Sequence, residues 1–278
     1  MGLRRRPFLG ASLALLVGGS RSLAVAAEPS IRLGTLPVVS TRTAHEIYHP
    51  LLMHLEKAFG VPVHLETPPN FRGMYQRIRE NAFDLLVSPP HIARLAQKRL
   101  GWHPVVLCQP EHRSVLLALE DGGPANLEAL RGGTIAVLDN IALVAMIMMD
   151  ALAKKGLTSE RDFHVIETRS YDSSQIAVRQ GVAQAMVARS QGFIDPNARD
   201  RLRVLFAAGV LPGYVFIAAP ATTNGQLQKL RSQLLAFSGT REAKPFLEKL
   251  GYDALAVATE EAMRRLDYYL DTTESRLN

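Results

Sequence analysis

The only cysteine of the 278-residue chain, Cys108, lies in the stretch PVVLCQPEHR, which ends at Arg113. His112 and Arg113 follow it closely, and cationic neighbours favour the thiolate, the form of cysteine that attacks electrophiles and binds soft metals and metalloids. A lone thiol cannot form a disulfide within the chain, and free cysteines are also often buried as small hydrophobic residues. The residues leave two interpretations open, a ligand-binding thiol and a core residue.

Other polar side chains follow apolar segments that have the character of β-strands. Ser40 and Thr41 precede a helical pattern, where a hydroxyl can cap the helix and still contact a ligand. Asp139 and Asn140 have the same two possible roles before a second helical pattern. Arg189 ends an apolar segment and is either a surface arginine or a group that binds an anion.

The sequence offers little support for metal or cofactor chemistry. The spacing of His91, His103 and His112 relative to Cys108 matches no zinc-binding pattern. There is no glycine-rich phosphate loop and no signature of a catalytic triad. We therefore expect no metal and no cofactor. An exported enzyme that uses Cys108 as nucleophile and a nearby histidine as base is a remote alternative.

The N-terminal segment has the layout of an export signal. Three arginines at positions 4–6 precede an apolar run that begins at Phe8, and the small residues AVAA follow at 24–27. The run is shorter than the ~20 residues of a membrane-spanning helix. We expect residues 1–27 to be a signal of the twin-arginine type, cleaved after Ala26 or Ala27, so that the mature protein reaches the periplasm with no stable membrane insertion.

Charge and size restrict the class of the mature protein. Arginines of the predicted signal account for four of the six net positive charges, so the remaining chain is nearly neutral and nucleic acid is not an expected partner. About 250 residues are enough for one large domain or two lobes with their own cores. Since no internal disulfide can form, these cores must be stable by packing alone.

Strand-like and helix-like segments alternate along the chain, which predicts an α/β fold with parallel βαβ units. Expected helices cover residues 44–59, 71–81, 90–99, 142–155, 173–180, 224–238, 241–250 and 259–272. We predict a first lobe from 28–112, a second lobe from 113–212 and a return to the first lobe at 213–278. Chain crossings near 109–116 and 208–216 would act as a hinge, with a ligand cleft between the lobes.

Several stretches resemble the PhnD-like family of phosphonate and oxyanion binding proteins. They include IRLGTLP near the start, PPNFRGMYQRIRENAFDLLVSPP, LEALRGGTIAVLD, IAVRQGVAQAMV, LPGYVFIAAP and LGYDALAVATEE. Their order and spacing extend over nearly the whole mature chain. The resemblance implies a two-lobe periplasmic binding protein of the type II fold, which closes around a small anion by hinge motion.

The chain departs from this family where phosphonate would bind. Family members carry a Ser/Thr-rich loop where this chain has the apolar NIALVAMIMM, a histidine where it has Tyr171, and an aspartate where it has Gln184. Ser88 occupies a position where the family presents a polar or aromatic side chain, although a simple turn before Pro89 explains it equally well. The resemblance therefore implies the fold and the cleft, with Tyr171 and Ser88 as candidate ligand contacts, but not phosphonate itself.

One branch of the family, the AioX arsenite sensors, is similar to this chain in combining the fold with a lone ligand cysteine. This resemblance implies arsenite binding through Cys108, with His112 nearby, and a sensor histidine kinase as membrane partner. The alternative is a substrate-binding component of an ABC importer for phosphate, phosphite or phosphonate, with a permease as partner. In both cases we expect ligand binding and closure, with no chemistry on the ligand.

Overall fold

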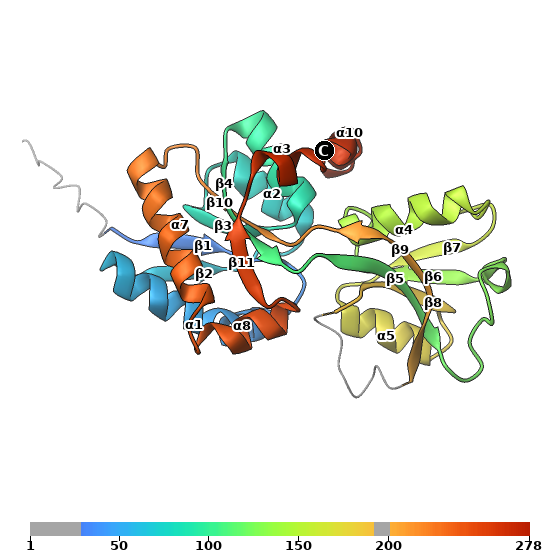
Figure 1. Ribbon diagram of the computed structural model, residues 1–278. Helices are drawn as coiled ribbons and strands as arrows, with labels where there is room; N and C mark the ends of the chain where they lie inside the picture. Colours follow the sequence, from blue (N-terminus) through green and yellow to red (C-terminus); the bar gives the residue numbers. More distant parts are fainter. Residues whose placement is uncertain (1–28, 192–200) are drawn as a thin grey trace, which may run out of the picture.

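The computed structural model describes residues 29–191 and 201–278, which form two lobes, each built on a β-sheet (Figure 1). The predicted export signal, residues 1–27, lies outside the described residues. The first sheet has the order β11-β4-β10-β3-β1-β2 and the second has the order β7-β6-β8-β5-β9. The α/β class and the two-lobe type II architecture are as predicted.

The first sheet combines strands from both ends of the chain. Its members are β1 (Ile31–Gly34), β2 (Val63–Glu66), β3 (Leu85–Ser88), β4 (His103–Gln109), β10 (Val215–Ala218) and β11 (Ala254–Val257). β1 pairs in parallel with β2 and β3, whereas β10 is antiparallel to both β3 and β4. The sheet is therefore mixed, because the returning chain inserts β10 in the opposite direction between two strands of the first segment.

The second sheet has a similar mixed organisation. Its strands are β5 (His112–Leu119), β6 (Thr134–Val137), β7 (His164–Glu167), β8 (Ala185–Arg189) and β9 (Leu202–Leu211). β6 is parallel to β7 and β8, and β5 is antiparallel to β8 and β9. Figure 1 shows β5 and β9 running side by side from the junction with the first lobe into the second, where they form the two crossings of the chain.

Helices cover both faces of each sheet (Figure 1). On the first sheet, one face packs against α1 (Thr41–Phe59), α7 (Asn224–Ser238) and α8 (Ala243–Leu250), and the other against α2 (Phe71–Arg79), α3 (Pro90–Leu100), α9 (Glu260–Arg264) and α10 (Leu270–Leu277). The second sheet lies between α4 (Leu143–Lys154) and α5 (Tyr171–Arg179). Because both faces are covered, the strands are apolar throughout rather than alternating.

The end of the chain differs from the prediction of three successive helices. Ala254–Val257 forms the edge strand β11, paired with β4, and the expected helix 259–272 is divided into α9, a 3-10 turn (Asp267–Tyr269) and α10. The buried guanidinium of Arg94 on α3 explains this division. It binds Asp267 at 2.6 Å and Glu260 at 2.9 Å, which fixes both segments on α3.

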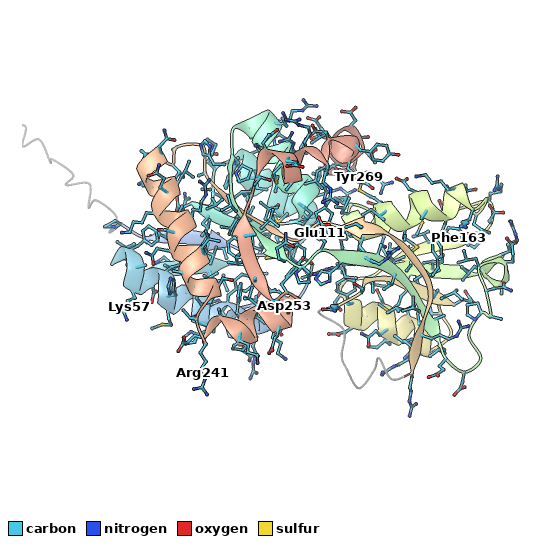
Figure 2. All side chains as sticks on the ribbon, viewed as in Figure 1. Lys57, Glu111, Phe163, Arg241, Asp253 and Tyr269 are labelled. Carbon is cyan, nitrogen blue, oxygen red and sulfur yellow. The ribbon has the colours of Figure 1, made fainter. Side chains whose placement is uncertain are left out.

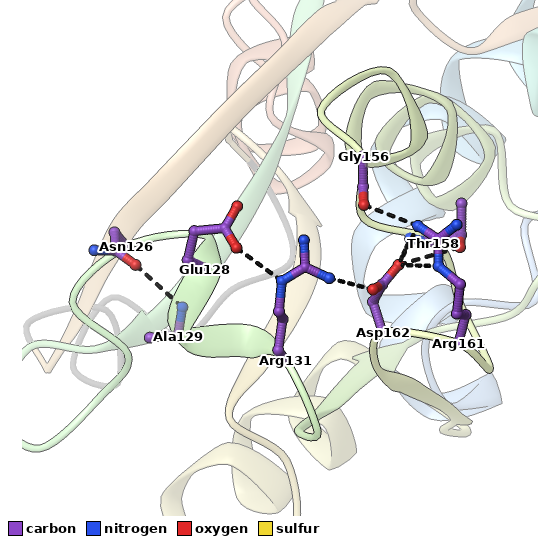
Figure 3. Close-up of polar contacts among 8 residues, drawn as sticks. All are labelled: Asn126, Glu128, Ala129, Arg131, Gly156, Thr158, Arg161 and Asp162. Carbon is purple, nitrogen blue, oxygen red and sulfur yellow. Dashed lines mark hydrogen bonds and ion pairs between the residues drawn. The ribbon is translucent and has the colours of Figure 1, made fainter.

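The second lobe has a polar network far from its partner lobe (Figure 3). Asp162 accepts hydrogen bonds from the backbone N–H of Thr158 and from Arg161, and it pairs with Arg131 of the turn that precedes β6. These contacts, with Arg161 the strongest, hold the pKa of Asp162 well below its usual range. The network connects the loops at this end of the second sheet and therefore has a structural role.

Candidate ligand-binding site between the lobes

Four helices begin at a pocket between the lobes. Phe71 of α2, Pro90 of α3, Leu143 of α4 and Tyr171 of α5 are the first residues of their helices, and all four line the pocket. The positive ends of helix dipoles favour anions. Because two of these helices belong to each lobe, an anion held here would contact both lobes at once.

The remaining wall of the pocket is almost entirely apolar. It consists of Val38 and Pro89 from the first lobe, Leu138, Ala142 and Val144 from the second, and Leu211, Pro212 and Tyr214 from the returning crossing. The pocket encloses about 370 Å³ of space between atoms, at the small end of the ~300–1,000 Å³ typical of ligand sites. A small molecule with an apolar part fits these dimensions and this chemistry.

Arg189 provides the positive charge of the pocket. It ends β8, is 2 % exposed, and lies with its guanidinium carbon 4.6 Å from the ring centroids of both Tyr214 and Tyr252. Within the described residues, its Nε, Nη1 and Nη2 atoms are buried without a hydrogen-bond partner. Buried arginines are normally paired, so a guanidinium with five unused N–H groups in a pocket is suited to bind an oxyanion.

The tyrosines around Arg189 belong to a larger buried polar cluster. The Tyr252 hydroxyl accepts a hydrogen bond from the backbone N–H of Tyr214 at 3.1 Å, and the His112 ring lies 4.7 Å from the Tyr252 ring. Burial, together with the nearby charge of Arg189, lowers the pKa of His112 to about 4. His112 is therefore neutral at physiological pH and leaves the positive charge of the cluster to Arg189.

Cys108 borders this cluster but does not line the pocket. Its neighbour Leu107 faces the α9 side of the sheet, so Cys108 faces the opposite side, where its thiol is close enough to Tyr48 and Tyr252 to influence their pKa values. Burial raises the pKa of Cys108 to about 12, although Arg189 partly opposes this effect. The expectation that His112 favours the thiolate is therefore wrong, because His112 is neutral and the thiol is fully desolvated.

Three hydroxyl residues lie outside the pocket lining. Ser40 is the N-cap of α1, where its Oγ accepts a hydrogen bond from the Thr43 N–H at 3.1 Å, which confirms the expected capping role. Thr41 is the exposed first residue of α1. Ser88 is fully buried at the end of β3 and donates to the carbonyl oxygen of Pro89 at 3.1 Å, as expected for a turn.

Asp139 and Asn140 do not cap a helix, contrary to expectation. The N-cap of α4 is Ala142, whereas Asp139 accepts the N–H of Ile141 at 2.8 Å and so stabilises the turn before the helix. The expected capping role of Asp172 is also wrong, because α5 begins two residues earlier than predicted. This earlier start makes Tyr171, rather than Ser173, the first residue of the helix.

A second, more polar pocket lies at the edge of the interlobe contact. It shares Phe71 and Leu138 with the apolar pocket and is also lined by Arg72, Asp139 and Glu167. Burial and the nearby Glu167 carboxylate raise the pKa of Asp139. Arg72 belongs to the first lobe and the two acids to the second, so opposite charges face each other where the lobes meet.

Further contacts hold the lobes together. The fully buried His91 of α3 contacts the carbonyl oxygen of Ile141 in the second lobe through Nε2 at 2.9 Å, and Arg276 of α10 donates to the carbonyl oxygen of Asn140. Glu111, labelled at the junction of the lobes in Figure 2, pairs with Arg265 at 2.5 Å. The structure is therefore a closed arrangement in which both lobes bury the pocket.

Sequence reasoning found two members of the site, Tyr171 and Arg189, and missed the tyrosines that position Arg189. Tyr214 was visible within LPGY at the expected returning crossing, but Tyr252 lies 38 residues further along the chain. Nothing in the local sequence connects Tyr252 with Arg189. The two meet because the chain returns to the first lobe and adds α8 and β11 beside β4.

Comparison with known proteins agrees with this architecture. Residues 33–263 match the family described as the periplasmic substrate-binding protein of phosphonate ABC transporters. The chain belongs to this family. Its members are periplasmic binding proteins, and no helix within the described residues has the length and apolar character needed to cross a membrane.

Solved structures share the fold at low sequence identity. A binding protein component of an ABC phosphonate transporter from Pseudomonas aeruginosa is 18 % identical with a TM-score of 0.76, covering 90 % of this chain and 89 % of that one. PhnD1 from Prochlorococcus marinus, in complex with methylphosphonate, is 14 % identical with a TM-score of 0.75, covering 88 % and 98 %. The aliphatic sulphonate binding protein SsuA from Escherichia coli is 15 % identical with a TM-score of 0.63, covering 88 % and 92 %.

Proposed function

We propose that this family member is the solute-binding component of an ABC importer and that Arg189 binds the oxyanion group of its ligand in the interlobe pocket. The observation that carries this proposal is the guanidinium of Arg189, which is buried without a hydrogen-bond partner among the described residues and lies where four helices begin. An unpaired buried charge costs several kcal/mol. The two tyrosine rings offset part of this cost, and a bound anion would offset more.

Ligand binding would be coupled to closure because the site needs both lobes. Arg189 and Tyr171 come from the second lobe, whereas Phe71 and Tyr252 come from the first. A ligand that contacts both lobes shifts the population toward the closed form. The closed protein would then deliver the ligand to the permease, with no chemical change in the ligand.

The test is isothermal titration calorimetry with sulfate, phosphate, methanesulfonate, methylphosphonate and acetate. We expect at least one of these anions to bind the wild-type protein, and Arg189→Gln to weaken that binding about 10- to 100-fold, the loss expected for a hydrogen-bonded charge. Arg189→Lys keeps the charge but not the bidentate geometry and should be intermediate. Arg113→Gln removes an exposed arginine of β5 and is the matched control. Equal binding by Arg189→Gln would refute the role of Arg189.

Arsenite binding through Cys108 is a second candidate, and a sensor kinase would then be the partner. The observation in its favour is that the thiol borders the Arg189 cluster, where the nearby Tyr48 hydroxyl is buried without a hydrogen-bond partner among the described residues. Arsenite is soft and thiophilic, and hydroxyl groups could hold its oxygens. Arsenite binding that is lost in Cys108→Ser but kept in Arg189→Gln would favour this candidate over the importer.

A further inference from the structure

The apolar wall opposite Arg189 carries information about the part of the ligand that is not the anion. Ala142, Leu143 and Val144 at the start of α4 are each at most 6 % exposed, and Leu211 of β9 is 4 % exposed. All four line the pocket that holds Arg189. A ligand whose oxyanion lies on Arg189 would place any substituent against these hydrocarbon side chains.

The aromatic faces near the site are already occupied. Tyr214 and Tyr252 each present a ring to the guanidinium of Arg189 at 4.6 Å. Tyrosine faces are a common binding site for organic ammonium groups. Here the protein fills that site with its own cation, so the cluster cannot also accept a cation from a ligand.

No carboxylate among the described residues lines the apolar pocket. The nearest acids identified, Asp139 and Glu167, line the neighbouring pocket beyond Phe71 and Leu138 and accept the backbone N–H groups of Ile141 and Asn140. An ammonium group in the apolar pocket would therefore lose its water without gaining a counter-charge, which is strongly unfavourable.

We infer that the site selects a small organic oxyanion with a short alkyl group and no amino group. This inference rests on the proposed function and adds the class of ligand. The oxyanion contacts Arg189 and the alkyl group packs on the wall formed by the start of α4 and by Leu211. Each methylene group buried there should improve the affinity about fourfold.

The experiment measures dissociation constants of the wild-type protein for matched sets of anions. The sulfonate set is sulfate, methanesulfonate, ethanesulfonate and taurine, which is ethanesulfonate with an amino group. The phosphonate set is phosphate, methylphosphonate, ethylphosphonate and 2-aminoethylphosphonate. The carboxylate set is acetate, propionate and β-alanine. Binding in one set and not in the others identifies the type of oxyanion.

Within the set that binds, we expect the two-carbon alkyl anion to bind most tightly and its amino derivative to bind at least tenfold more weakly. An amino derivative that binds as tightly as, or more tightly than, the alkyl anion would overturn this inference but leave the proposed function intact. The absence of binding by every anion would overturn both.

A pair of variants tests the position of the alkyl group. Leu143→Asp places a carboxylate on the wall, at the first residue of α4, where a negative charge is favourable for the helix. We expect it to reverse the preference in favour of the amino derivative, whereas Leu143→Asn, of equal size but uncharged, should not. If both variants leave the preference unchanged, the alkyl group does not lie against Leu143 and the inferred placement is wrong.

Discussion

The guanidinium carbon of Arg189 lies 4.6 Å from the ring centroid of Tyr252, although the two residues belong to different lobes. Arg189 ends β8 of the second sheet, and Tyr252 lies between α8 and β11 of the first lobe. This contact connects the charge of the pocket directly to lobe closure. Opening the lobes must separate the arginine from the aromatic face and expose it to water.

Replacing Tyr252 should therefore weaken both closure and ligand binding. Tyr252→Leu removes the aromatic face, and we expect a loss of about 0.5–2 kcal/mol in the free energy of unfolding, together with weaker anion binding. Tyr252→Phe keeps the face but loses the hydroxyl that accepts the N–H of Tyr214, so it should preserve the contact with Arg189 better. Denaturant unfolding measures the first effect and calorimetry the second. Equal anion affinity in Tyr252→Leu and wild type would contradict a role for the contact.

Acidic pH should favour the open form through His91. Burial lowers the pKa of His91 to about 4, with Arg276 adding a smaller effect in the same direction, whereas an exposed histidine titrates near 6.5. The unfolded or open state therefore binds the proton more readily, so the stabilising contribution of neutral His91 is full above about pH 6.5 and is lost as the pH falls toward 4.

His91→Gln provides the measurement, since glutamine can also donate to the carbonyl oxygen of Ile141 but does not titrate. We expect the free energy of unfolding of the wild type to fall more steeply than that of His91→Gln between pH 6.5 and 4. His112 has a similarly lowered pKa and remains in both proteins, so the comparison isolates His91. Parallel curves over this range would show that His91 does not contribute.

The thiol of Cys108 should be unreactive in the folded protein. Alkylation requires the thiolate, and the pKa of about 12 together with complete burial leaves almost none of it accessible at pH 8. We expect iodoacetamide to modify Cys108 rapidly in denaturant and at least ~100-fold more slowly under native conditions. Mass spectrometry over time measures both rates. Rapid native modification would show that the thiol is reachable, which would strengthen the arsenite candidate.

The case of Cys108 shows what the sequence could and could not predict. The alternation of apolar and helical segments predicted the α/β class and the order of most elements, because local patterning determines them. β4, however, is covered on both faces, so its apolar residues do not alternate and the direction of Cys108 could not be derived. Arg189 had the same ambiguity at the end of β8. Long-range packing against Tyr214 and Tyr252 decides its position.

The returning crossing should be intolerant of substitution at Gly213. A Cβ atom there would collide with the backbone carbonyl of Cys108, and the backbone N–H of Cys108 is already bonded to the carbonyl oxygen of Tyr214 at 2.8 Å. Neither backbone segment can move without disturbing β4 or β10, so we expect Gly213→Ala to lower the free energy of unfolding by about 1–3 kcal/mol. Gly225→Ala is the matched control, because a Cβ at this position in the first turn of α7 meets no atom within 4 Å. We expect that control to be neutral or to stabilise the protein by up to about 1 kcal/mol. Equal stability of the two variants would contradict the close approach of the chains at the hinge.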